Sequence, residues 1–396
     1  MTDFTPRLRE DAALLHPPAY PRIARLEDIA PHVAENRAIR TFADGPLTTM
    51  RYMVNDPSVF RTPWDLEARG LVFDTASGAI LSRPFHKFFT LANAESAAAL
   101  LEGGPVSLFE KHDGSMLGGF MWQGVSRVHT KGGFTGHALT AQERLTRGPA
   151  ALIAEADSLG VTPIFEWVAP DNRIVLDYAE EDFILLAVRH RVTGDYDEAL
   201  AADLAARHGV RRPAVLAVVS NVEDLVEWVG RIAARTGTEG AVATGPGGWR
   251  GKMKTRAYLA VHKAMSMLSV ERHAFSAIVG EMDDDIVPLL TPEQGAFLAA
   301  YGRALRERML EVCAAAESMA ADLADLPRGE AAARIQAGIE PDLRPLVFAA
   351  LGGKPVFETL GGALKRRSGS QAAVEAARAA FGLPAWSPPP GLFLKD

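Results

Sequence analysis

The chain has 396 residues, of which 48% are hydrophobic and 23% are charged, and its formal net charge is -7. This length is enough for two or three domains with buried cores, and the composition is that of a globular protein. The negative net charge argues against a protein coated with nucleic acid, although it is compatible with a local basic groove.

The single cysteine, Cys313, excludes an intrachain disulfide framework and a cysteine-cluster metal site, and it favours a reducing cytosol. No stretch approaches the length of a membrane span, and the N-terminus lacks the layout of a secretory signal. We therefore expect a cytoplasmic protein without a membrane partner.

The N-terminal part of the chain predicts mixed structure and then two charges in apolar surroundings. Residues 26–33 have helical spacing, and residues 52–54 indicate a short strand. Residues 68–74 predict a strand that carries Arg69 beside a glycine, and Lys87 precedes two phenylalanines. Such charges are costly unless they meet an anion or solvent. Taken singly, each is explained better by a solvated surface position.

Residues 109–116, Phe-Glu-Lys-His-Asp-Gly-Ser-Met, place Lys111 two residues before an Asp-Gly turn with an apolar run on each side. The pattern predicts a hairpin, in which Asp113 caps the turn and Gly114 tolerates a positive φ. A lysine held there could be a nucleophile, because burial and neighbouring cations would lower its pKa. An ordinary hairpin with a surface lysine is the plainer explanation of these residues alone.

Two further charges belong to the strands that follow. Lys131 stands at a strand end beside two glycines, where backbone can approach a phosphate closely. Glu166 interrupts an apolar strand over residues 162–169, and strand alternation puts it on the face opposite to Trp167. A carboxylate in such a strand is costly without a partner.

Residues 196–235 predict helices packed on the sheet, and the next block predicts a hairpin. Glu239 enters its first strand, and Lys252 and Lys254 share one face of its second strand. Two like charges on one face need a shared anion or solvent, and an edge protected by lysines is the plainer explanation. Together with the earlier charges, however, they indicate strands that line one groove with phosphate-binding cations and a few carboxylates.

This ordered set resembles the covalent nucleotidyltransferases: RNA and DNA ligases and mRNA capping enzymes. The T-even-phage RNA ligase 1 family is the most similar, over roughly residues 50 to 265, through Ala68-Arg-Gly-Leu-Val-Phe, Arg83-Pro-Phe-His-Lys-Phe-Phe-Thr-Leu, Glu110-Lys-His-Asp-Gly-Ser and Ile184-Leu-Leu-Ala-Val-Arg. The resemblance implies an α+β fold. An ATP-grasp-like nucleotidyltransferase domain of antiparallel sheets with flanking helices would cover residues 1–265, including an N-terminal extension, and an all-α C-terminal domain residues 266–396.

The resemblance also implies roles for individual residues. Lys111 would attack the α-phosphate of ATP, and Arg69, Lys252 and Lys254 would assist catalysis. The residues implied to bind the nucleotide are Glu110, Lys87, Gly114, Lys131, Glu166, Val188 and Glu239. Glu239 and Asp113 are implied to hold Mg²⁺, or Mn²⁺ in its place, with oxygen ligands and water.

The implied activity is ATP-dependent joining of a 5′-phosphate and a 3′-hydroxyl RNA end, through a lysyl-AMP enzyme and an adenylylated RNA end. We expect a monomer that acts on single-stranded RNA ends, with transfer RNA as one candidate and an end-healing kinase or phosphatase as a partner. If a phage encodes it, its place is the host cytoplasm. A DNA ligase, a GTP-using capping-type enzyme and a non-catalytic RNA-end binding protein on the same fold stay open as alternatives.

From about residue 266 the sequence predicts helices. Thr291 and Gln294 form a capping box around Pro292, and an apolar stripe follows at Phe297, Tyr301, Leu305 and Met309. Residues 365–367, Lys-Arg-Arg, indicate a solvated basic turn more than an RNA contact. No β domain is evident after Lys254, which favours RNA ligase over DNA ligase and capping enzyme.

Overall fold

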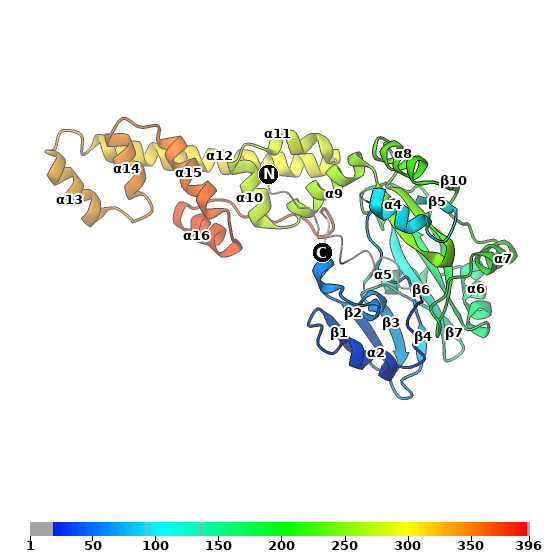
Figure 1. The fold of residues 1–396 in the computed structure, drawn as a ribbon. Helices are drawn as coiled ribbons and strands as arrows, with labels where there is room; N and C mark the ends of the chain where they lie inside the picture. Colours follow the sequence, from blue (N-terminus) through cyan, green and yellow to red (C-terminus); the bar gives the residue numbers. More distant parts are fainter. Residues whose placement is uncertain (1–18, 92–93, 135, 394–396) are drawn as a thin grey trace. The chain divides into compact units, whose positions relative to one another are not determined.

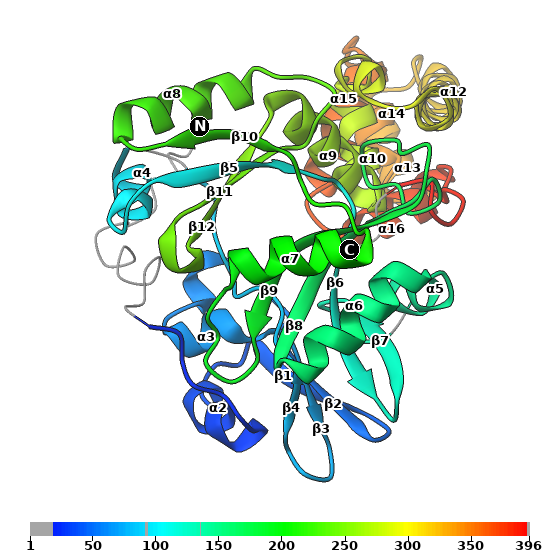
Figure 2. The same ribbon diagram turned by 90° about the vertical axis from the view of Figure 1, so that its right-hand side faces the viewer.

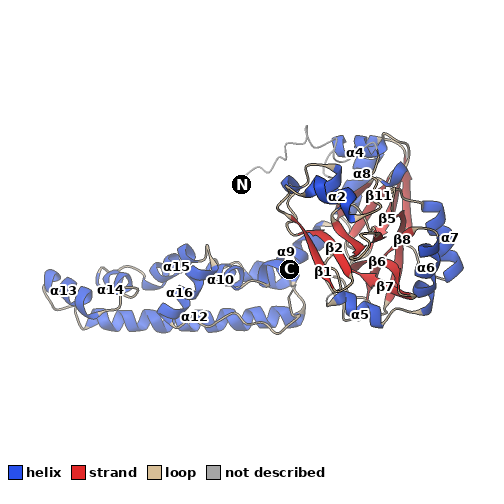
Figure 3. Cartoon of the chain, turned by 90° about the horizontal axis from the view of Figure 1, so that it is seen from below, coloured by secondary structure: helices blue, strands red, loops and turns tan. Residues whose placement is uncertain are grey.

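The computed structural model describes residues 19–91, 94–134 and 136–393 (Figure 1). The chain divides into two compact units, Met1–Leu259 and Ala260–Asp396, with the boundary inside helix α9 (Arg256–Leu268). Strands occur in the first unit, whereas the described residues of the second unit form helices and turns (Figure 3). The predicted α+β fold with a helical C-terminal part is confirmed, while the roles given to the two parts stay predictions.

Three four-stranded antiparallel sheets are formed by the described residues of the first unit (Figure 2). The first has the order β1 (Ile39–Asp44), β2 (Leu47–Tyr52), β3 (Arg69–Asp74), β4 (Ile80–Ser82). The second has the order β10 (Val215–Val219), β5 (Val106–Lys111), β11 (Gly240–Thr244), β12 (Arg250–Lys254). The third has the order β7 (Val125–His129), β6 (Ser115–Trp122), β8 (Val161–Val168), β9 (Asp182–His190).

Helices complete the first unit: α2 (Leu26–Val33), η1 (Pro57–Val59), α3 (Pro63–Glu67), α4 (Ala94–Leu101), α5 (His137–Glu143), α6 (Arg147–Ser158), α7 (Glu198–His208), α8 (Val222–Ala233) and η2 (Pro246–Gly248). Each sheet has its own apolar core, because alternate strand residues point to one face. The first sheet packs on α2 and α3 through Leu71 and Phe73. The second packs on α4 and α8 through Leu108, and the third packs on α6 and α7 through Phe165.

The segment Asp113-Gly114 is not the hairpin turn that the sequence predicts. Strand β5 belongs to the second sheet and β6 to the third, so this short segment carries the chain from one sheet to another. Gly114 does not have a positive φ. A glycine is needed there because a Cβ atom would lie 2.3 Å from the carbonyl oxygen of Trp167. A dipeptide typical of turns cannot reveal which strands pair on its two sides.

Strand β10 is the second difference from the sequence prediction. Residues 196–235 were expected to be helical, but Val215–Val219 pairs antiparallel with β5 between helices α7 and α8. The run Val-Leu-Ala-Val-Val lacks the alternation of a half-buried strand, and short apolar runs do not distinguish strand from helix. The strand lies at the edge of its sheet, and Val218 is 64% exposed.

A fully buried ion cluster ties the first sheet to the third. Glu67, at the end of α3, lies 2.9 Å from Arg83 Nη2 and 2.7 Å from Arg189 Nη2. Burial alone would raise the pKa of Glu67, but the two guanidinium groups outweigh it and hold the pKa at about 2. Arg189 also stacks between the rings of Tyr20 and Tyr196, each 4.8 Å from its Cζ atom.

We expect Glu67→Gln to lower the free energy of unfolding by about 3–5 kcal/mol, because it leaves two buried guanidinium groups without a counter-charge. Urea denaturation at neutral pH measures the loss, with Glu27→Gln on the exposed face of α2 as the control. Because the folded pKa of Glu67 is depressed, its contribution is complete at neutral pH and disappears as the pH falls toward 2. Equal stability of the two variants would contradict a structural role for the cluster.

The second unit consists of α10 (Glu271–Val279), α11 (Asp283–Ile286), η3 (Val287–Leu289), α12 (Pro292–Ala321), α13 (Arg328–Gly338), α14 (Arg344–Leu351), α15 (Val356–Arg367) and α16 (Gln371–Phe381). The predicted capping box at Thr291 and Gln294 begins α12. Tyr301, Leu305 and Met309 are buried along this helix, as the stripe predicts. Among the described residues, no helix combines the length and apolarity needed to cross a membrane.

Candidate functional site

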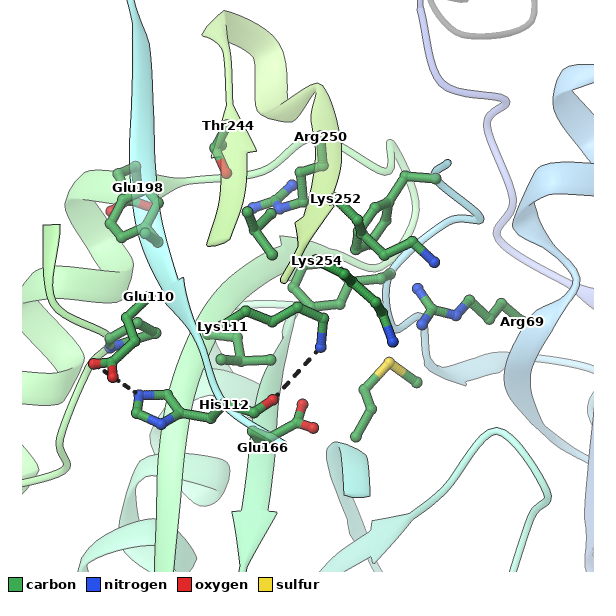
Figure 4. A pocket seen from close by; sticks show the side chains of 17 residues that line it. Arg69, Glu110, Lys111, His112, Glu166, Glu198, Thr244, Arg250, Lys252 and Lys254 are labelled. Atoms are coloured by element: carbon green, nitrogen blue, oxygen red, sulfur yellow. Dashed lines mark hydrogen bonds and ion pairs between the residues drawn. The ribbon is translucent and has the colours of Figure 1, made fainter. Parts of the chain in front are cut away.

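A cavity of about 830 Å³ opens on the first unit and is lined by residues of all three sheets (Figure 4). It brings together many of the residues that the sequence singled out. These residues are Arg69, Glu110, Lys111, Glu166, Lys252 and Lys254. In Figure 4 the side-chain ends of Arg69, Lys111, Glu166, Lys252 and Lys254 lie around one space, whereas Glu110 points toward His112. Phe85, Phe88, Leu186 and Val242 add apolar walls.

Glu239 bridges two of the lysines. Its Oε2 atom lies 2.7 Å from Lys111 Nζ, and its Oε1 atom lies 2.9 Å from Lys254 Nζ. In the register of the second sheet, Gly240 lies opposite both lysines, with Lys111 on β5 and Lys254 on β12. A Cβ atom at position 240 would lie 1.9 Å from the carbonyl oxygen of Met253. The glycine therefore lets the three strands close up around one carboxylate.

The electrostatics of Lys111 differ from the expectation. The sequence predicts neighbouring cations that lower its pKa, and burial does act in that direction. However, Glu239 is in contact, and Glu166 and Asp113 add further negative charge, so that the pKa of Lys111 lies above its ordinary value. The same attraction, from Lys111 and Lys254, lowers the pKa of Glu239 although burial alone would raise it. In this state Lys111 is a protonated partner in an ion pair.

Glu166 is a buried carboxylate with one backbone partner. As strand alternation predicts, it faces the cavity, whereas Trp167 lies in the core of the third sheet. Its Oε1 atom accepts a hydrogen bond of 3.0 Å from the Gly114 backbone N–H. Burial and then the charge of Glu239 raise the pKa of Glu166 to about 7, against the opposing effect of Lys111.

Lys252 and Arg69 lie on the other side of the cavity, where the described residues offer them no carboxylate within ion-pair distance. Both approach the Phe88 ring: Lys252 Nζ lies 5.6 Å and Arg69 Cζ 5.2 Å from its centre. Burial, followed by the charges of Arg69 and Lys87, lowers the pKa of Lys252 to about 7. This side of the cavity is therefore prepared for an anion.

Lys87 and Lys131 do not line the cavity but lie next to Arg69. Their Nζ atoms lie 5.5 Å and 4.4 Å from the centre of the Tyr52 ring. Burial and the charges of Arg69 and Lys131 lower the pKa of Lys87 to about 8. Lys87 also donates a short hydrogen bond to the side-chain oxygen of Asn55. The two lysines thus extend the cationic side of the cavity.

Two further predicted site residues, Asp113 and Val188, are not part of the cavity wall. The carboxylate of Asp113, expected to hold a metal, accepts 2.8 Å hydrogen bonds from the backbone N–H groups of Val175 and Leu176 and a 2.6 Å bond from the Tyr258 hydroxyl. Val188, expected to contact the nucleotide, is fully buried in the core of the third sheet. A register shift opposite Ile164/Phe165 leaves Leu186 as the extra residue of a bulge, and it is Leu186 that lines the cavity.

The sequence interpretation missed Arg250 and His112. Arg250 lines the cavity and stacks between Phe85 and Tyr196, with its Cζ atom 4.7 Å and 4.1 Å from their ring centres. It lies two residues before Lys252, so the same alternation could have found it. His112 is buried, and its Nε2 atom lies 3.6 Å from Glu110 Oε2. The sequence pattern singles out its neighbour Lys111 and gives no separate signal for His112.

A divalent cation fits only one of the two predicted ligands. The hydrogen bonds of Asp113 occupy both of its carboxylate oxygens, whereas Glu239 reaches the cavity wall but is bonded to two lysines. In the part of the chain that the structure describes, no three acidic, histidine or cysteine side chains are grouped as a metal site. Glu239 therefore fits a cation held mainly by water and by a bound ligand.

The site thus combines antiparallel sheets around a cavity with one lysine on a strand end, two buried carboxylates and additional cations. Residues 67–258 match the family described as RNA ligase. The matching segment is just under half of the chain.

Two individual proteins are similar to this chain in sequence, and a solved structure is similar to it in fold. A protein named Putative RNA ligase from Thermovibrio ammonificans is 34% identical over 175 residues, which cover 43% of this chain and 46% of that one. RNA ligase 1 of Bacteriophage TS2126 is 30% identical over 185 residues, with the same coverage of 43% and 46%. The chain thus spans less than half the length of these relatives. A solved structure titled Archaeal ATP-dependent RNA ligase has a TM-score of 0.46 and 19% identity, over 61% of this chain and 64% of that one.

We expect Glu239→Gln to lower the pKa of Lys111 to below its ordinary value, because burial then acts without the nearest counter-charge. Titration of ¹³C-methylated lysines by NMR, with Lys111→Arg to assign the signal, measures the change. Glu110→Gln is the control, because Glu110 faces His112 instead. A Lys111 signal that titrates alike in wild type and Glu239→Gln would contradict this account.

Proposed function

We propose that this chain is an ATP-dependent RNA ligase that joins a 5′-phosphate to a 3′-hydroxyl through an AMP bonded to Lys111. One observation carries the proposal: Lys111 stands at the wall of a cavity whose other side is cationic, within the segment that matches the RNA ligase family. Two relatives whose names include RNA ligase each match 43% of the chain.

In the first step, the Lys111 amine attacks the α-phosphorus of ATP. A P–N bond forms, the bond from the α-phosphorus to the β-phosphate oxygen breaks, and pyrophosphate leaves with the electron pair. The amine must be neutral for this, so one proton leaves Nζ to solvent before the attack, and a second leaves the nitrogen once the P–N bond has formed. Because Glu239 holds Lys111 protonated in the ligand-free protein, we infer that Glu239 separates from Lys111 before the attack.

The cations supply positioning and charge neutralisation. Lys252 and Lys254 emerge from one strand face and reach the side of the cavity toward which Lys111 points. Arg69, supported by Lys87 and Lys131, would bind the other phosphates. Such preorganised positive charge lowers the barrier of phosphoryl transfer because negative charge moves onto the leaving pyrophosphate.

The remaining walls suit the nucleoside. Leu186 and Val242 provide apolar surface for adenine beside Glu110, and Glu166 provides an acceptor for a ribose hydroxyl. With its pKa at about 7, Glu166 accepts such a hydrogen bond best in its charged form. Glu239 with water would hold Mg²⁺ or Mn²⁺, which would neutralise phosphate charge when bound.

Two further transfers complete the proposed reaction. A 5′-phosphate oxygen of RNA takes the AMP and the Lys111 P–N bond breaks, and a 3′-hydroxyl then attacks the 5′-phosphate and releases AMP. The substrate class we propose is single-stranded RNA ends, with transfer RNA among the candidates. We further propose a monomeric, cytoplasmic enzyme that receives its ends from a kinase or phosphatase.

We expect Lys111→Ala to abolish an acid-labile protein–AMP adduct that the wild type forms with α-labelled ATP and a divalent cation. The amine is the only group of residue 111 that can bond to phosphorus, and Lys111→Arg serves as the charge-retaining control because its guanidinium stays protonated. Parallel labelling with GTP tests the capping-type alternative. Adduct formation by either variant would place the nucleophile elsewhere.

We expect Lys252→Ala to lower the rate of adduct formation by about 10²–10³-fold, as removal of one preorganised charge does in other sites. Its unfolding transition should stay close to that of the wild type. The backbone bonds of residue 252 are kept, and the Lys252 side chain approaches the Phe88 ring without an ion pair or hydrogen bond to any described residue. Arg256→Ala, at an exposed position just after β12, is the matched control. A Lys252→Ala protein that adenylylates normally would exclude Lys252 from the reaction.

A further inference from the structure

Three arginines form one row across the first sheet. In the strand register, Arg40 on β1 lies directly opposite Arg51 on β2, and Arg51 lies directly opposite Arg69 on β3. With neighbouring strands about 4.8 Å apart, the row spans roughly 10 Å. Arg69 lines the nucleotide cavity at one end, and Arg40 is exposed on the edge strand at the other.

Without a bound anion, the repulsion between these three arginines destabilises the folded protein. Like charges directly opposite each other on antiparallel strands repel, and their side chains share one face of the sheet. Within the described residues, none of the three arginines pairs with a carboxylate. Instead, Arg40 donates to the carbonyl of Ile39 at 3.0 Å, Arg69 to that of His86 at 3.3 Å, and Arg51 to that of Gly132.

Two observations show that the row suits an external anion. The Nε atoms of Arg51 and Arg69 are buried and have no hydrogen-bond partner among the described residues. Lys131 stands close enough to both arginines for their charges, after burial, to lower its pKa. A contiguous cationic surface without neutralising carboxylates attracts a polyanion, even on a protein of negative net charge.

An exposed aromatic ring lies beside the row. Phe42 shares the face of Arg40 two residues further along β1, and it is 37% exposed. Arg51 Cζ lies 4.3 Å from the centre of its ring. An aromatic ring flanked by guanidinium groups is a stacking platform for an unpaired base, in the way that single-stranded nucleic acid is bound.

We propose that the arginine row and Phe42 bind the backbone and one base of a single-stranded RNA whose 5′-phosphate end reaches the nucleotide cavity. This inference rests on the proposed ligase function and adds the path of its substrate. A polymer is favoured over a free nucleotide because Arg40 and Phe42 lie two strands away from the cavity. Arg69, at the junction, would contact whichever phosphate is nearest to Lys111.

The test compares two pairs of exposed side chains on edge strands. Arg40→Ala/Phe42→Ala removes a cation and an apolar side chain two residues apart on β1. Val125→Ala/Arg127→Ala removes the equivalent pair on β7, where Val125 is 49% exposed and Arg127 is also exposed. Binding is measured by fluorescence anisotropy with a 5′-phosphorylated, 3′-blocked single-stranded RNA at several salt concentrations.

We expect the β1 double variant to bind RNA roughly ten-fold or more weakly, and the β7 double variant to bind like the wild type. The two single variants, Arg40→Ala and Phe42→Ala, separate the contribution of the cation from that of the aromatic ring. Arg40→Ala should reduce the slope of log affinity against log salt by about 0.7, the value for one phosphate contact of a single strand. Phe42→Ala should weaken binding at every salt concentration, and Phe42→Trp should restore it.

The same proteins are assayed for the protein–AMP adduct with ATP alone and for joining of RNA ends. The ratio of joining to adduct formation should fall in the β1 double variant. Equal RNA affinity for the β1 and β7 double variants, or an unchanged salt slope in Arg40→Ala, would overturn the proposed track. A wild type that forms no adduct would instead overturn the ligase function, and the anisotropy would still decide whether the row binds RNA.

Discussion

A single buried carboxylate holds the candidate site in its present arrangement. Glu239 is 2% exposed and bonds Lys111 with one oxygen and Lys254 with the other. Taking this carboxylate out of water is costly, and only two close cations compensate for that cost. The arrangement needs three strands in close contact, which Gly240 allows. The ion pair with Glu239 also keeps Lys111, the proposed nucleophile, protonated.

Charge is distributed unevenly around the cavity. On one side Glu239 and Glu166 compensate Lys111 and Lys254, while on the other Lys252 and Arg69 face each other without acidic partners. Burial, and then the charges of Arg69 and Lys87, lower the pKa of Lys252 on this second side. An anionic ligand completes the charge balance there. A protein that keeps such repulsion in its folded state exchanges some stability for affinity, which is the usual relation between a binding site and the fold that carries it.

Much of this arrangement could be predicted from the sequence, because strand alternation is a local property. It placed Glu166 opposite to Trp167 and put Lys252 and Lys254 on one face. What it could not reveal depends on pairing between distant segments. Asp113-Gly114 has the composition of a hairpin, yet the strands on its two sides join different sheets. Nor could strand alternation reveal the bulge in β9 that places Leu186 at the cavity, while Val188 lies in the core of the third sheet.

The predicted direction of the Lys111 pKa shift was wrong for a similar reason. The sequence shows which charges exist but not which one comes into contact, and at short range the nearest charge dominates. Counting cations along the chain therefore predicted the wrong direction of the shift. The cross-strand row of Arg40, Arg51 and Arg69 was invisible for the same reason: these residues are far apart in the chain, and only the register of three strands aligns them.

The ion cluster of Glu67, Arg83 and Arg189 has a consequence for substrate geometry. It joins helix α3, the segment after β4 and strand β9, so that the first sheet cannot slide against the third without separating buried charges. The exposed edge of the first sheet is thereby kept at a constant separation from the third sheet, whose Glu166 lines the cavity beside Lys111. A flexible polymer that runs from this edge to the cavity would cross a fixed distance. The number of nucleotides that spans this distance would then be set by the fold.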